Sequence, residues 1–83
     1  MNEVIIDEDD FKKRAISAHY KYYKKEFGVD PEQPGWNDST VETYKDKYYV
    51  ILRNVNGILG IYRIRNDNVL KRLRRWPTVF DED

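Results

Sequence analysis

The residues best suited to chemistry in this sequence are cationic side chains interleaved with aromatic ones in its second half. Arginine guanidinium groups make bidentate contacts with phosphate, and aromatic rings stack on unpaired bases. The pattern predicts a nucleic-acid-binding surface on a basic and aromatic sheet face. Its candidate residues are Tyr48, Arg63, Arg65, Lys71, Arg72, Arg74, Arg75 and Trp76.

The overall charge limits the strength expected of such a surface. The chain holds 15 Lys and Arg against 15 Asp and Glu, and its isoelectric point is about 6.6. The isoelectric point of a domain dedicated to nucleic-acid binding usually exceeds about 9. The charges nevertheless fall into alternating acidic and basic blocks. Such blocks form either a basic surface with acidic edges or ion pairs between segments.

A second basic group lies in the first third of the chain. Its members fall on one face of an expected helix, and we expect that face to lack acidic partners one turn away. They form a secondary candidate surface: Lys13, Arg14, Lys21, Lys24 and Lys25.

A hypothesis of another class uses the apolar side chains of the same region. An exposed strand edge and an apolar sheet face would make a protein-interaction module or a homodimer. The anchors of that face would be Leu52, Leu59 and Ile61. Exposure of Tyr48 and Trp76 among arginines favours nucleic acid, whereas a contiguous apolar patch favours a protein partner.

Several kinds of chemistry have no basis in the sequence. The chain has no Cys and one His, so thiolate zinc sites and multi-histidine metal sites are not expected. Ser17 and Ser39 lie in no nucleophile motif, and the four Gly match no phosphate-binding loop. We therefore expect no enzyme activity, no cofactor and no metal, with His19 as a packed histidine.

Residues 8–27 have the spacing of an amphipathic helix with a broad apolar face. Asp7 is the expected N-cap, supported by Asp10, and Gly28 is the expected C-terminal residue ahead of Pro31. The following residues, 28–39, are rich in turn formers, and Trp36 among them is expected to fold back over the core.

Residues 40–65 read as strands over 40–44, 48–55 and 58–65. Asn56-Gly57 between apolar runs is a strong hairpin signal. With these two residues as the turn, Val55 faces Ile58 and Tyr48 faces Arg65. The expected helix-facing set is then Tyr49, Ile51, Val55, Ile58, Tyr62 and Ile64. The other face is expected to be too mixed for a second core.

Residues 68–76 are ambiguous, because their periodicity favours a helix while the short connection favours a strand. We favour a strand over 69–73 that runs into a basic tail. The fold class is then α+β, with an N-terminal amphipathic helix packed on an antiparallel meander of three or four strands. Residues 1–83 are expected to form one domain with flexible acidic ends at about 1–3 and 78–83. No membrane association and a cytoplasmic location are expected.

Overall fold

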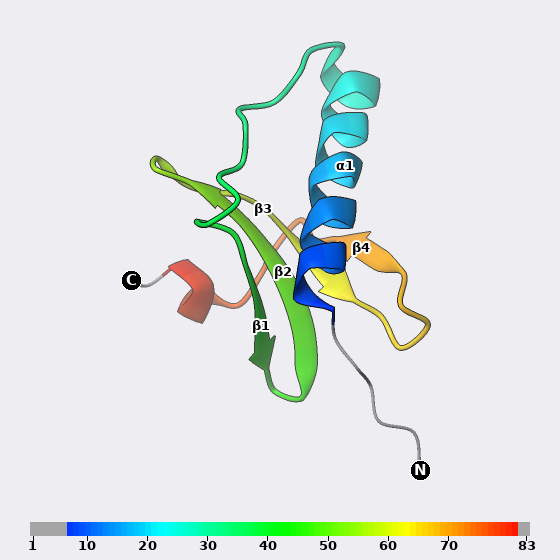
Figure 1. Ribbon diagram of the computed structural model, residues 1–83, viewed down its shortest axis with the longest axis vertical. Helices are drawn as coiled ribbons and strands as arrows, with labels where there is room; N and C mark the ends of the chain where they lie inside the picture. The colour runs from blue at the N-terminus through cyan, green and yellow to red at the C-terminus, as the bar shows by residue number, and fades with distance from the viewer. Residues whose placement is uncertain (1–6, 82–83) are drawn as a thin grey trace.

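The computed structural model describes residues 7–81, which form one helix, a four-stranded sheet and a short C-terminal 3-10 helix. The expected fold class is confirmed, because α1 (Glu8–Phe27) packs against an antiparallel meander of order β1-β2-β3-β4. The strands are β1 (Thr40–Tyr44), β2 (Lys47–Asn54), β3 (Gly57–Ile64) and β4 (Leu70–Arg72). Figure 1 shows the sheet between α1 and the 3-10 helix η1 (Thr78–Asp81).

Both ends of α1 carry the caps that the sequence predicts. The Asp7 carboxylate accepts a hydrogen bond from the backbone N–H of Asp10 at 3.1 Å. Gly28 adopts φ 71°, and its N–H donates to the carbonyl of Lys24 at 3.0 Å. A left-handed residue at this position is least costly for Gly, so the helix ends there.

The β2–β3 hairpin differs from its expected register by two residues at the turn and by one residue over Tyr48–Leu52. Asn54 pairs with Gly57, so that Val55 and Asn56 form the turn and Val55 is 92 % exposed. A β-bulge between Leu52 and Arg53 changes the offset from two residues to one. Local hydrogen bonds hold the turn in its place. Asn54 Oδ1 accepts from the backbone N–H of Asn56 at 2.8 Å, and Glu32 Oε1 accepts from both asparagine side chains at 3.2 and 3.0 Å.

The bulge exchanges the faces of β2 over Tyr48–Leu52, because an offset of two residues keeps a side chain on its face whereas an offset of one reverses it. Tyr48 pairs with Ile64 rather than Arg65, and Tyr49 pairs with Arg63. The core under α1 is built by Phe11, Ala15, Val50, Leu52, Tyr62 and Ile64. The expectation for Tyr62 and Ile64 is confirmed, whereas the placement of Tyr49, Ile51, Val55 and Ile58 under α1 is wrong.

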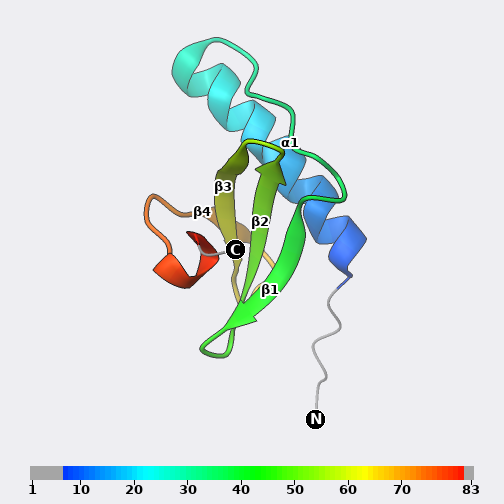
Figure 2. The ribbon, with the colours of Figure 1, turned by 90° about the vertical axis from the view of Figure 1, so that its left-hand side faces the viewer.

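The opposite sheet face carries a second core, contrary to the expectation that it was too mixed. Tyr49, Ile51, Ile61 and Phe80 are buried there, with Trp76 packed against them. Residues 78–83 were expected to be a frayed end, but Phe80 on η1 is only 5 % exposed. Figure 2 shows α1 and η1 on opposite faces of the sheet. The other expected flexible end, residues 1–3, lies outside the described residues.

The ambiguous segment 68–76 contains a strand, as favoured, but a shorter one. β4 covers Leu70–Arg72, and the N–H of Leu73 adds one further bond to the carbonyl of Ile61 at 2.9 Å. Trp36 also differs from its expected place over the apolar core. It covers the buried side chain of Lys12, whose Nζ lies 4.3 Å from the ring centroid.

Candidate nucleic-acid interface

The β3–β4 hairpin places cations side by side on the sheet face away from α1. Arg63 pairs directly with Lys71, and Arg65 lies two residues further along the chain, just past the end of β3. Alternate residues of a strand point to the same face, so Arg63 and Arg65 share the face of Lys71. These three cations line a hollow of about 500 Å³ together with Asn66 and Asp67.

The charge of this hollow is incompletely neutralised. Arg65 Nε lies 3.8 Å from Asp67 Oδ1, and both side chains are more than half exposed. Over residues 7–81, no carboxylate forms an ion pair with Arg63 or Lys71. Three cations and one acid leave the lining residues with a net charge of +2. An exposed ion pair contributes little in water, so Arg65 can exchange Asp67 for another anion at low cost.

Arg63 is held in an unusual environment. Its Nε is buried and has no hydrogen-bond partner in the part of the chain that the structure describes. The side chain as a whole is half-buried and lines both this hollow and a neighbouring one of about 290 Å³. A guanidinium can only donate, so its remaining donors have the chemistry to engage an external acceptor.

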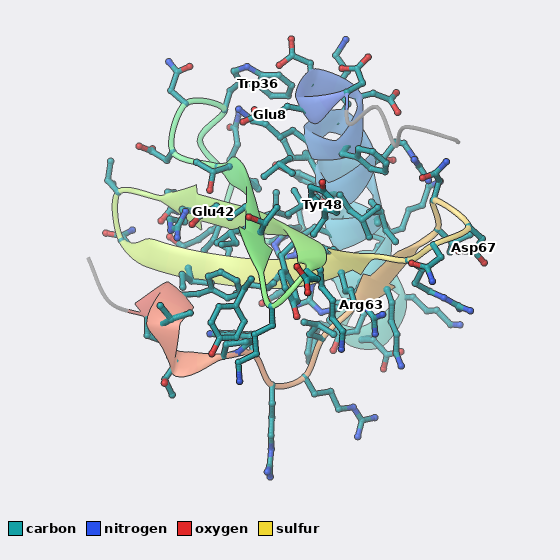
Figure 3. The ribbon with its side chains drawn as sticks, turned by 90° about the horizontal axis from the view of Figure 1, so that it is seen from below. Glu8, Trp36, Glu42, Tyr48, Arg63 and Asp67 are labelled. Atoms are coloured by element: carbon teal, nitrogen blue, oxygen red, sulfur yellow. The ribbon has the colours of Figure 1, made fainter. Side chains whose placement is uncertain are left out.

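Tyr48 does not share a face with the arginines, contrary to the prediction. Its pairing with Ile64 puts it on the α1 side, where it packs against the core. Figure 3 shows Tyr48 on the α1 side of the sheet and Arg63 on the other. Tyr48 still borders the smaller hollow, because that hollow opens at the end of the sheet between the β1–β2 and β3–β4 turns.

Arg72 points inward, toward α1, and is not part of the basic surface. Its Nη1 lies 3.0 Å from His19 Nδ1 and donates to the Tyr62 hydroxyl at 3.0 Å. The guanidinium carbon lies 4.1 Å from the centroid of the Tyr22 ring. This removes Arg72 from the predicted set of phosphate contacts.

The His19 ring is 1 % exposed, and its neighbours determine its protonation. Because guanidinium groups donate only, Nδ1 must accept from Arg72 and the ring proton resides on Nε2. Burial, and secondarily the Arg72 charge, lower the pKa of His19 from 6.5 to about 4. Burial raises the pKa of Tyr62, with an opposing effect of the Arg72 hydrogen bond. His19 is therefore neutral at pH 7 and plays the packing role expected of it.

The remaining predicted contacts divide into two kinds. Arg74 and Arg75 are exposed on the segment after β4. Trp76 is half-buried against the second core, and its Nε1 donates to Asp81 Oδ1 at 3.0 Å. The tail therefore offers two exposed cations that form no ion pair among residues 7–81, and one aromatic ring that packs partly against the second core.

The basic face of α1 is exposed at Lys13, Lys21, Lys24 and Lys25. Arg14 is different, since its Nη2 donates to the carbonyl of Asn68 at 2.7 Å and its Nη1 lies 3.9 Å from Asp10 Oδ2. The expectation that this face lacks acidic partners one turn away is wrong at that position. The acid comes from the first helical turn, where it also complements the helix dipole.

The apolar patch of the alternative hypothesis is not formed. Leu52 and Ile61 are completely buried and belong to the two different cores. Leu59 alone remains half-buried, in the irregular part of the β2–β3 ladder.

Sequence reasoning missed Asn66 and Asp67, which line the larger hollow. Both residues lie in a turn between two strand ends that carry basic residues. This position could have indicated their place in the site, because turn residues lie close to the side chains at the two strand ends. It also missed the partnership of His19 with Arg72, which are 53 residues apart and share no local pattern.

Among residues 7–81, no group of three or more potential ligands could hold a metal ion. Within the same range, no helix is both long and apolar enough to cross a membrane. The cytoplasmic location stays a prediction. Comparison of the chain with protein-family models, with curated proteins and with solved structures finds no match.

Proposed function

We propose that this chain is a non-catalytic domain that binds nucleic acid through phosphate contacts on the β3–β4 hairpin. The observation that carries the proposal is the pairing of Arg63 with Lys71 beside a hollow of about 500 Å³, without a carboxylate partner for either among residues 7–81. Adjacent cations on a rigid strand pair suit the repeating charge of a phosphate backbone. Arg65, Arg74 and Arg75 extend this cationic surface.

The affinity expected from such a surface is modest and depends on salt. Contacts to phosphate carry no base sequence information, so binding is largely independent of sequence. A dissociation constant on the order of 10 µM is typical of this binding at physiological salt. With Arg63, Arg65 and Lys71 on three phosphates, log K should fall with log salt with a slope of about −2.

The test is fluorescence anisotropy of a labelled single-stranded oligonucleotide of about 12 nucleotides, between about 50 and 200 mM salt. The double variant Arg63→Ala, Lys71→Ala should bind more weakly and reduce the slope to about −0.7. The matched control is Lys24→Ala, Lys25→Ala, which removes the same charge from the end of α1. Circular dichroism verifies that both variants fold.

Two results would overturn the proposal. Equal losses of affinity in the two double variants would show that the β3–β4 hairpin is not the binding site, since binding would then depend only on total charge. No binding by the unchanged protein at low salt would remove nucleic acid as the ligand. Self-association through an open strand edge is the alternative, because β1 has a strand on one side only. Light scattering over a range of concentrations detects a dimer directly.

A further inference from the structure

A third hollow lies at the far end of β4, between this strand and the C-terminal half of α1. It measures about 630 Å³. Its apolar wall is built by Tyr22, Leu59, Leu73 and Trp76, and Arg74 stands at its border. Figure 2 shows the C-terminal half of α1 continuing past the strands. We call this hollow the aromatic groove.

A β-bulge directs Leu59 into the groove. Leu52 pairs with Gly60 while Arg53 pairs with Ile58, so Leu59 has no opposite residue on β2. An unpaired residue of this kind escapes the strict alternation of the strand, and bulges commonly re-aim a side chain. β4 also pairs only with residues 62–64 of β3, so the part of β3 beside Leu59 has no strand on its outer side.

Tyr22 is held in place on the opposite wall. The guanidinium of Arg72 lies against its ring, with 4.1 Å between the guanidinium carbon and the ring centroid. The rings of Tyr23 and Phe27 contact it edge-on, at centroid distances of 5.8 and 6.1 Å. Tyr22 nevertheless remains 36 % exposed. A fixed and partly exposed ring is suited to stacking, because little side-chain entropy is lost on binding.

The charges that line the groove are mixed, because Glu26 and two arginines border it. Arg72 is engaged with His19 and Tyr62, whereas Arg74 is exposed and forms no ion pair among residues 7–81. Arg74 follows Lys71 by three residues, or about 10 Å of extended chain. A ligand that reaches from the hairpin hollow to the groove is therefore expected to place anionic groups on Lys71 and Arg74 and a flat, uncharged group against the aromatic wall, away from Glu26.

We infer that the aromatic groove takes a base of the nucleic-acid strand whose phosphates lie on Lys71 and Arg74. This inference rests on the proposed function and deepens it. A duplex keeps its bases stacked inside, whereas a single strand can turn a base outward onto aromatic side chains. The domain should therefore prefer single strands over duplexes.

The test compares three probes of equal length: a thymidine oligonucleotide, an abasic strand with the same phosphates, and a duplex. The Trp36→Phe protein leaves Trp76 as the sole tryptophan. The thymidine strand should quench Trp76 fluorescence, and the abasic strand should not. The thymidine strand should also bind at least about fivefold more tightly than the abasic strand, because one base stacks in the groove.

A matched pair of variants locates the effect. Leu59→Glu places a carboxylate in the groove, and Val55→Glu places the same charge at the exposed hairpin turn. Leu59→Glu should abolish the difference between thymidine and abasic strands, and Val55→Glu should preserve it. If Leu59→Glu does not fold, the quenching of Trp76 in the otherwise unchanged protein decides the question.

The outcomes separate this inference from the proposal beneath it. Equal, salt-dependent binding of thymidine and abasic strands would overturn the inference about the groove but would be consistent with the proposed phosphate-binding surface. Tighter binding of the duplex would also overturn the groove. Failure of all three probes to bind at low salt would overturn both.

Discussion

Arg72 on the edge strand and His19 on α1 are joined by a hydrogen bond of 3.0 Å between Nη1 and Nδ1, across 53 residues of sequence. The same guanidinium nitrogen donates to the Tyr62 hydroxyl at 3.0 Å. One side chain therefore ties β4, β3 and α1 together. Lys71, the preceding residue on β4, points to the opposite face, so this tie also positions a cation of the proposed binding surface.

The first prediction concerns the stabilising role of Arg72. Arg72→Ala should lower the free energy of unfolding by about 2 kcal/mol, because His19 and Tyr62 each lose a charge-assisted hydrogen bond in a buried place. Urea denaturation measures the loss. Arg72→Lys should recover only part of it, since an ammonium lacks the planar guanidinium that lies against the Tyr22 ring.

Arg75→Ala is the matched control, because Arg75 is exposed and forms no ion pair within residues 7–81. It should change the unfolding free energy by no more than about 0.5 kcal/mol. Equal stability of the Arg72→Ala and Arg75→Ala proteins would show that the tie between β4 and α1 contributes nothing.

The second prediction is a dependence of stability on pH that arises from His19. Its pKa is lowered to about 4 in the folded protein, against 6.5 as the ordinary value. Between these values the unfolded chain binds more protons, so stability must fall as pH decreases from about 6.5 to about 4. The full loss from this group is about 3 kcal/mol, at 1.36 kcal/mol per pH unit.

His19→Asn isolates this effect from the titration of carboxylates. Asparagine retains an acceptor near the Nδ1 position but has no proton to gain. The difference in stability between the two proteins should vary with pH below about 6.5 and be constant above it. A constant difference across the acid range, or an NMR titration of His19 with an ordinary pKa, would contradict the prediction.

The third prediction is that Gly60 is required by Arg72. A Cβ at position 60 would lie 3.0 Å from Arg72 Nη1, which is closer than normal packing permits. Gly60→Ala should therefore cost about 1 kcal/mol, from displacement of the guanidinium. In the Arg72→Ala background the same substitution should cost almost nothing, and a double-mutant cycle measures this coupling. Additive effects would show that Gly60 is constrained by something other than Arg72.

The fourth prediction tests the C-terminal segment. Phe80 packs edge-on against Tyr49 and Tyr44, with ring centroids 5.1 and 5.9 Å apart. Phe80→Ala should destabilise the protein by about 3 kcal/mol, because a buried aromatic ring is removed from the second core. Val79→Ala is the control, since Val79 is adjacent and 45 % exposed. Similarly small changes in stability from both substitutions would indicate that the C-terminal segment is frayed rather than packed.

Local features of the sequence were sufficient to predict the elements themselves. Asp7 and Gly28 mark the ends of α1, because capping depends only on residues within one turn. The apolar runs on either side of Asn56-Gly57 likewise identified β2 and β3, and the meander followed from the short connections between the strands.

The sheet register and the direction of the key cations were decided only by tertiary structure. Glu32, which is 22 and 24 residues away from the two asparagines, helps to hold the β2–β3 turn. The bulge between Leu52 and Arg53 then leaves an offset of one residue, which moves Tyr48 away from the face of Arg63. Arg72 looks like its basic neighbours in sequence, but His19 and the aromatic rings draw it inward. Charge type is a local property, whereas the partner that an arginine meets depends on how distant segments pack.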